Sequence, residues 1–101
     1  MRMLVFFDLP METGEEKRNY REFRKALIKN GFIMLQKSVY SKVLLTPSVG
    51  NSAKNLIHRV KPPKGLVQTL TVTEKQFAKM EFIVRESNSE YIDNDERLVI
   101  L

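Results

Sequence analysis

Cysteine is absent from the sequence, and histidine occurs once, as His58. Without cysteine there are no disulfide bonds and no thiolate ligands, and a lone histidine removes most zinc-based and histidine-based catalytic schemes. Long apolar runs are missing too, since the N-terminal run stops at Asp8, too early for a signal sequence or a membrane span. We therefore expect a soluble, cytoplasmic protein.

Acidic residues are missing from the centre of the chain. Between Glu22 and Glu74 there is no Asp or Glu, whereas nine Lys and Arg residues fall in this stretch, and the net charge of the whole chain is +5. Such segregation favours a polyanionic partner, because each neutralised phosphate releases counterions. A solvated basic face on an ordinary protein explains the same pattern equally well.

The pattern of apolar and capping residues predicts a strand, a helix and a hairpin. Residues 2–9 form an apolar run typical of a strand covered on both faces. A capping box at 13–16 opens a helix that Asn30 and Gly31 end. In residues 32–45 the alternation of apolar and polar side chains changes phase near 36–38. This change indicates two short strands with a tight reversal, or one strand with a sharp bulge.

The next segments complete an α+β domain. A helix runs from near Ser48 to a point before Pro62, and residues 65–72 form a strand. The order βαββαβ is that of ferredoxin-like domains, and 101 residues suffice for one core.

The remainder of the chain is expected to extend this domain. A capping box at 73–76 opens a short helix to Met80, and residues 82–84 form a short strand. We place the ferredoxin-like domain at 1–86 and an acidic loop with a C-terminal strand at 87–101. The apolar end of that strand is expected to pair with a sheet edge or dock a partner, and it consists of Leu98, Val99, Ile100 and Leu101.

Asp8 is the candidate catalytic and metal-binding residue. It ends a buried strand, and ligand sites gather at such strand ends. The alternative is a carboxylate that bonds amides of the local turn. Mg²⁺ commonly uses one or two carboxylates plus waters, so a second carboxylate is needed. Candidates for it are Glu12, Glu15, Glu16 and Asp8 of a two-fold partner. His58 has no visible partner for a role as general base.

The candidate nucleic-acid contacts lie on the first helix and the hairpin, and they are Lys17, Arg18, Arg21, Arg24, Lys25, Lys37 and Lys42. An RNA-recognition module shares the element order, but residues 29–35 lack its strand signature, so base reading by strand aromatics is not expected. Tyr40 fits either the core or a surface for stacking bases.

An ordered set of motifs resembles a known family over nearly the whole chain, up to about Glu86. These motifs are Phe7–Pro10, Arg18–Arg21, Phe23–Lys25, Gly31–Tyr40, Pro62–Gly65 and Leu70–Gln76. Together they resemble the small CRISPR-associated adaptation protein, the partner of the CRISPR integrase, in the variety associated with type II systems.

The resemblance implies a role in CRISPR spacer acquisition. The expected protein is a homodimer that binds double-stranded DNA and bridges integrase dimers while new spacers are integrated. Asp8 matches the strand-end Asp that is a Mg²⁺ ligand across the two-fold axis in members described as metal-dependent endoribonucleases or deoxyribonucleases. The alternative function is therefore a magnesium-dependent endonuclease. A third possibility is a generic interaction module with an incidental basic face.

Overall fold

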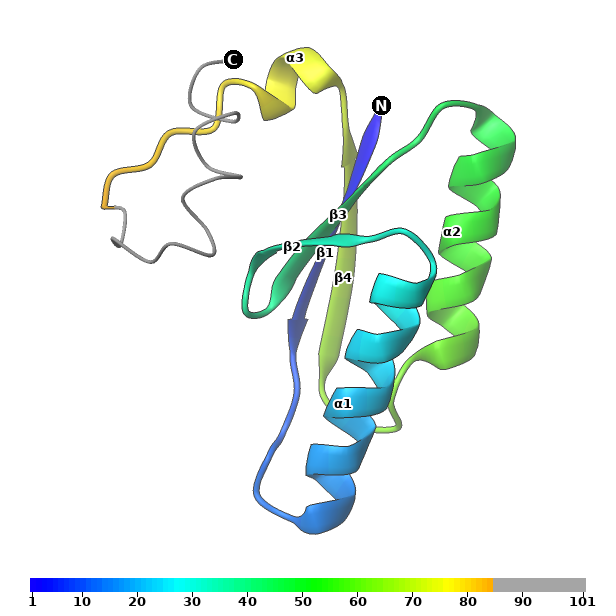
Figure 1. Cartoon of the computed structure of the whole chain (residues 1–101), viewed down its shortest axis with the longest axis vertical. Helices are drawn as coiled ribbons and strands as arrows, with labels where there is room; N and C mark the ends of the chain where they lie inside the picture. The colour runs from blue at the N-terminus through cyan, green and yellow to red at the C-terminus, as the bar shows by residue number, and fades with distance from the viewer. Residues whose placement is uncertain (85–101) are drawn as a thin grey trace.

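The computed structural model describes residues 1–84, and Figure 1 shows their path. The strands are β1 (Arg2–Asp8), β2 (Ile33–Gln36), β3 (Val39–Val43) and β4 (Leu66–Val72). The helices are α1 (Gly14–Lys29), α2 (Pro47–Val60) and the short α3 (Glu74–Phe77). Within residues 1–84, no helix combines the length and the apolar character that crossing a membrane requires.

The four strands form one antiparallel sheet in the order β2-β3-β1-β4. Helices α1 and α2 lie together on one side of this sheet (Figure 1). With the element order βαββαβ, this strand order is the ferredoxin-like arrangement, so the predicted fold class is confirmed.

The segment 32–45 is a hairpin, as the first of the two sequence interpretations proposed. The chain reverses at residues 37–38, and the register shifts between Met34 and Gln36. A bulge of this kind adds one unpaired residue to a strand. The phase change in the sequence therefore has two causes, a turn and a bulge beside it.

Both long helices begin at threonine caps. The Thr13 hydroxyl accepts a hydrogen bond from the Glu16 backbone N–H, and the Glu16 carboxylate accepts one from the Thr13 backbone N–H, which completes the predicted capping box. Thr46 caps α2, which starts at Pro47, one residue before the predicted start, because proline suits the first helical turn.

The core lies between the sheet and the two long helices. Its β1 members are the alternate residues Met3, Val5 and Phe7, which face the helices. The Phe7 ring meets the Phe23 ring of α1 edge-on at 5.1 Å and stacks on the Tyr40 ring at 5.7 Å. Tyr40 is fully buried, which places it in the core and excludes it as a surface for stacking bases.

The other side of the sheet carries an apolar surface, which we call the open face. Alternation along β1 places Leu4, Phe6 and Asp8 on this side. The large exposed side chains of the open face come from all three other strands, and they are Ile33, Val43, Leu66 and Leu70. Neither α1 nor α2 covers this face.

Helix α3 closes one end of the open face. The Arg2 guanidinium bonds both oxygens of the Glu74 carboxylate, at 2.7 and 3.0 Å, and lies 4.2 Å above the centre of the Phe77 ring. Phe77 is buried as a result.

Two predictions for the end of this region are wrong. Helix α3 ends at Phe77, three residues before Met80, and continues only as a turn. Residues 82–84 form no strand, and the side chains of Ile83 and Val84 are 82% and 86% exposed. No strand within residues 1–84 pairs with this segment, so its backbone has no ladder to join. The predicted loop and strand at 87–101, including Leu98–Leu101, lie outside the described residues.

Candidate functional site

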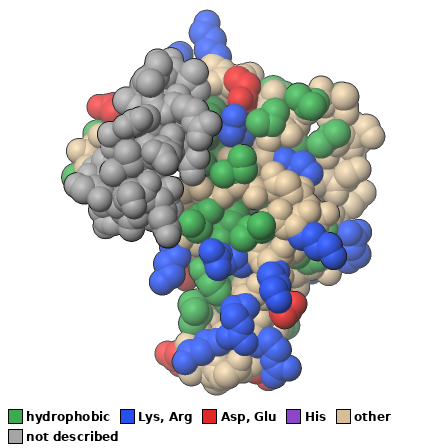
Figure 2. All heavy atoms as spheres, viewed as in Figure 1, with side chains coloured by type: hydrophobic (Ala, Val, Ile, Leu, Met, Phe, Trp, Pro, Cys, Tyr) green, Lys and Arg blue, Asp and Glu red, His purple; other side chains and the backbone are tan. Residues whose placement is uncertain are grey.

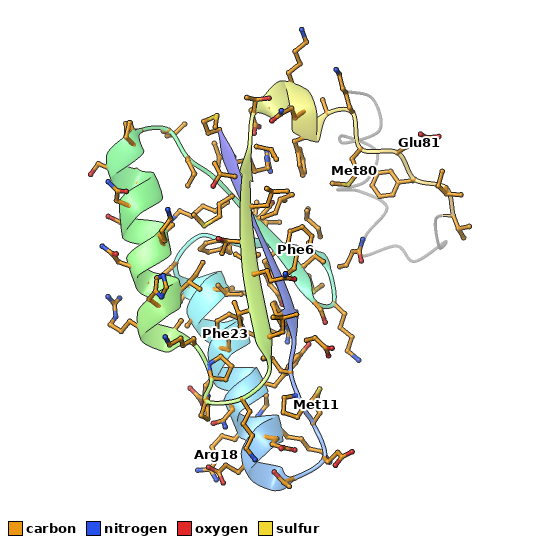
Figure 3. All side chains as sticks on the ribbon, turned by 180° about the vertical axis from the view of Figure 1, so that it is seen from behind. Phe6, Met11, Arg18, Phe23, Met80 and Glu81 are labelled. Carbon is orange, nitrogen blue, oxygen red and sulfur yellow. The ribbon has the colours of Figure 1, made fainter. Side chains whose placement is uncertain are left out.

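Helix α1 presents a row of exposed cations to solvent, which we call the basic face. Its members are Lys17, Arg18, Arg21, Arg24 and Lys25. Lys and Arg side chains gather over the lower part of the surface in Figure 2, where α1 lies, and Figure 3 shows Arg18 near the lower end of this helix. The row arises because core residues Phe23 and Leu27 occupy the opposite side of the helix.

Four members of the basic face form no salt bridge within residues 1–84, and they are Lys17, Arg18, Arg21 and Lys25. Within residues 1–84 one salt bridge is present, between Arg2 and Glu74, and it lies at the other end of the fold. Arg24 differs from its neighbours, because its Nε donates a 2.7 Å hydrogen bond to the hydroxyl of buried Tyr40. Arg24 therefore fastens α1 to the hairpin, a role that the sequence did not indicate.

The fold joins the hairpin to α1 at Lys37 and Lys42. The Tyr20 hydroxyl donates to the Lys37 carbonyl oxygen at 3.3 Å, and the Lys42 Nζ donates to the Asn30 carbonyl oxygen at 2.6 Å. These two attachment points are about 15 Å apart along a helix axis. The hairpin is thus joined to α1 through the backbone of Lys37 near Tyr20 and through the side chain of Lys42 at the C-terminal end of the helix.

Glu16 is engaged in the cap of α1. Its carboxylate accepts backbone N–H groups of Thr13 and Glu12 at 3.1 and 3.0 Å, and the bond from Thr13 is the main reason that the pKa of Glu16 is lowered. One oxygen atom of Glu16 already serves both bonds. Among the three glutamates considered as second metal ligands, this carboxylate is the one fixed by helix capping.

Asp8 is an exposed carboxylate at the end of β1. It is the last paired residue of the strand, opposite Leu66 of β4, on the open face. Across residues 1–84 no turn amide donates a hydrogen bond to its carboxylate, so the structure gives no support to a local capping role. A free carboxylate at a strand end is suited to bind a cation.

Gly65 fixes the position of the strand end that carries Asp8, and sequence analysis did not identify it as part of the site. Its φ is +101°, and a Cβ added there would lie 2.8 Å from the Asp8 carbonyl oxygen and 2.8 Å from Leu9 Cδ2. Only glycine allows both this backbone conformation and this close approach. The turn composition of Pro62–Gly65 was the available signal, but the contact with β1 is tertiary.

Asp8 does not belong to a cluster of three or more possible metal ligands within residues 1–84. Residues 1–84 contain no cluster of three or more His, Asp or Glu side chains able to hold a metal ion. His58 is exposed on α2. The carboxylate chemistry of Asp8 suits Mg²⁺, which prefers oxygen ligands and retains several waters, provided that a second carboxylate comes from elsewhere.

The sequence matches a known family and several of its members. A family model described as CRISPR associated protein Cas2 matches residues 1–80. A CRISPR-associated endoribonuclease Cas2 of Treponema denticola is 59% identical over 101 residues, the whole of both chains. A protein of the same name from Streptococcus mutans is 46% identical over 101 residues, which are 100% of this chain and 93% of that protein.

A solved structure supports the fold independently. The crystal structure of Streptococcus pyogenes Cas2 at pH 6.5 matches with a TM-score of 0.66 at 19% identity, and the match covers 83% of this chain and 100% of that chain. Because the family model spans residues 1–80 and close relatives align over the full length, the chain belongs to the Cas2 family of CRISPR-associated proteins.

Proposed function

We propose that this protein acts in CRISPR spacer acquisition as a homodimer that binds double-stranded DNA and bridges subunits of the CRISPR integrase. The observation that carries the proposal is the basic face of α1, with Lys37 and Lys42 of the hairpin joined to the same helix by hydrogen bonds. No acidic residue lies between Glu22 and Glu74, the stretch that holds Arg24, Lys25, Lys37 and Lys42. Cations spaced along a helix can contact successive phosphates of a nucleic-acid backbone. All duplexes share this backbone charge, so such contacts do not depend on the base sequence.

The open face supports the homodimer. Leu66 and Leu70 of β4 are each 53% exposed, beside Phe6 and Leu4 of β1. Apolar surface of this kind is stabilised when a second surface covers it. Strand β4 also pairs only with β1 within residues 1–84, which leaves its outer edge for another strand. A two-fold contact through the open face leaves α1 on the outside of each copy.

Backbone contacts predict binding that is independent of sequence and sensitive to salt. The logarithm of the binding constant should fall with the logarithm of salt concentration, with a slope of roughly −0.9 for each duplex phosphate neutralised. Duplexes of unrelated sequence should bind equally well at a given salt concentration.

The decisive experiment compares two charge reversals in duplex binding and in spacer acquisition in cells. Arg18→Glu with Arg21→Glu removes the centre of the basic face and should weaken binding by at least about tenfold at ~0.1 M salt and abolish acquisition. Lys75→Glu with Lys79→Glu makes the same change in charge near α3, outside the basic face, and serves as the control. Equal effects of the two pairs would contradict the proposal.

A second candidate function is a magnesium-dependent endonuclease. The exposed carboxylate of Asp8, without a bonded turn amide in the described chain, favours it, and the relatives carry the name endoribonuclease. Asp8 from each of two copies would hold the ion, and the open face that carries Asp8 is also the proposed dimer surface. When bound, Mg²⁺ supplies an activated water and stabilises charge on the phosphate.

Asp8→Asn separates the two functions. If the protein is a nuclease, the change abolishes cleavage of single-stranded RNA and duplex DNA, because asparagine lacks the carboxylate charge that holds Mg²⁺. If the protein acts as a DNA-binding scaffold, the Asp8→Asn variant still acquires spacers in cells. Cleavage that persists in a highly purified Asp8→Asn sample would count against a nuclease in which Asp8 holds the Mg²⁺.

A further inference from the structure

A polar hollow lies between the C-terminal end of α1, strand β3 and the exposed side of α2. It has a volume of about 310 Å³, and its polar lining consists of Asn30, Lys42, Ser52, Asn55 and Arg59. The three α2 residues are spaced three and four positions apart, so they share one face of the helix. Buried Ala53 and Leu56 support the hollow from below.

Backbone carbonyl groups at the end of α1, beside this hollow, already accept hydrogen bonds. At the end of α1, the carbonyl oxygens of Ala26, Leu27 and Ile28 accept bonds from Asn30, Phe32 and Gly31. The Asn30 carbonyl oxygen accepts the Lys42 ammonium at 2.6 Å. The partial negative charge at this helix end is therefore compensated within the fold.

The donors in the hollow retain spare capacity. An ammonium has three N–H groups, and Lys42 uses one of them on Asn30. The Arg59 guanidinium takes part in no salt bridge within residues 1–84, and the Ser52 hydroxyl and Asn55 amide add neutral donors. No carboxylate lines the hollow. Two cations with several free N–H groups and no competing acid form a site for an oxyanion.

We propose that this hollow binds a phosphate group. Its place in the fold indicates the source, because Lys42 lines the hollow and is bonded to Asn30, the residue that ends the helix carrying the basic face. A nucleic-acid backbone that follows α1 to its C-terminal end reaches Lys42 and then Arg59 of α2. This assignment rests on the proposed DNA-binding function and extends the contact surface from α1 to α2. A free phosphate or mononucleotide offers the same chemistry.

Two variants on α2 test the proposal. Arg59→Gln removes one charge from the hollow, whereas Lys54→Gln removes one charge from the same helix at a residue that does not line it. Both positions are exposed, so both variants should fold, which thermal unfolding followed by circular dichroism will verify. Duplex binding is then measured by fluorescence anisotropy across a series of NaCl concentrations. Separately, inorganic phosphate is titrated into each protein and backbone amide signals are followed by NMR, with NaCl at equal ionic strength as the reference.

If the hollow binds a backbone phosphate, Arg59→Gln should lower the magnitude of the log-log salt slope of duplex binding by about 0.9 per occupied hollow. The same variant should weaken duplex binding about eightfold at ~0.1 M salt. The slope should not change in Lys54→Gln. An unchanged slope, together with phosphate-induced shifts at 52–59 that Arg59→Gln abolishes, would assign the hollow to a free phosphate. An unchanged slope without such shifts would overturn the proposal. If the unaltered protein binds no duplex, the proposed function fails, and the phosphate titration alone decides whether the hollow binds a phosphate group.

Discussion

Gly65 determines where the carboxylate of Asp8 lies, although its own contribution to the site is only the lack of a side chain. Gly65→Ala should lower the free energy of unfolding by about 2 kcal/mol, because alanine is strained at positive φ and its Cβ would press on the end of β1. Gly14→Ala is the matched control, since nothing lies within 4 Å of the added Cβ. Urea unfolding of both variants provides the measurement, and equal stability of the two would contradict this account.

Tyr40 shows how a buried polar group joins two elements. Its hydroxyl accepts a part-buried hydrogen bond of 2.7 Å from the Nε of exposed Arg24 on α1. Tyr40→Phe should destabilise the fold by about 1–2 kcal/mol, because a charged donor loses an acceptor. Tyr20→Phe removes a longer, exposed bond to the Lys37 carbonyl oxygen and should have a smaller effect. Thermal unfolding of the two variants distinguishes them, and a larger loss for Tyr20→Phe would refute the prediction.

At the scale of elements, an ion pair and a cation–π contact, both from Arg2, attach α3 to β1 within residues 1–84. The hydrogen bonds from Arg2 are the main reason that the pKa of Glu74 lies below its usual value. A carboxylate with a lower pKa in the folded chain stabilises the fold above its unfolded pKa, and this contribution disappears as the pH falls through its folded pKa. The attachment of α3 should therefore weaken under acidic conditions.

Glu74→Gln tests this attachment. At neutral pH it should lower stability by at most about 1 kcal/mol, because Glu74 is half-exposed and solvent screens the pair. The difference from the unaltered protein should vanish once the pH lies below the folded pKa of Glu74. Glu81→Gln, an exposed carboxylate in the segment after α3, is the control and should change stability little at either pH. A difference that persists in acid would contradict the ion-pair explanation.

Helices bounded by capping residues or prolines could be predicted from the sequence, whereas contacts between distant elements could not. The capping box at Thr13 and the prolines around α2 act within a few residues, so both helices were placed to within about one residue. The apolar triplet 82–84 has the composition of a strand, but a strand exists only with a partner, and none is present within residues 1–84. The same limit applies to the site, because Asp8 and the row of cations can be read locally, whereas the Arg24–Tyr40 bond and the Gly65 contact depend on the tertiary fold.

For the whole molecule, the two candidate functions occupy opposite sides of the sheet. The helix side carries the basic face and the phosphate hollow, and the sheet side carries an apolar surface that ends at Asp8. A dimer formed through the sheet side, with its two-fold axis near the end of β1, would bring two copies of Asp8 towards each other without covering the cations. Dimer formation and DNA binding are compatible for this reason. A metal ion held by the two copies of Asp8 would change the strength of the dimer.

The dimer should respond to Mg²⁺ through Asp8. Two facing carboxylates repel each other, and a divalent cation between them removes that repulsion. In sedimentation equilibrium, Mg²⁺ should tighten the dimer of the unaltered protein on the order of tenfold relative to a chelator, which corresponds to about 1.4 kcal/mol. The Asp8→Asn dimer should be at least as tight in the chelator and insensitive to Mg²⁺. Leu70→Glu, which puts a charge on the open face, should give monomers in both conditions. Dimers of Asp8→Asn that still respond to Mg²⁺ would place the ion elsewhere, and dimers of Leu70→Glu would place the interface on another surface.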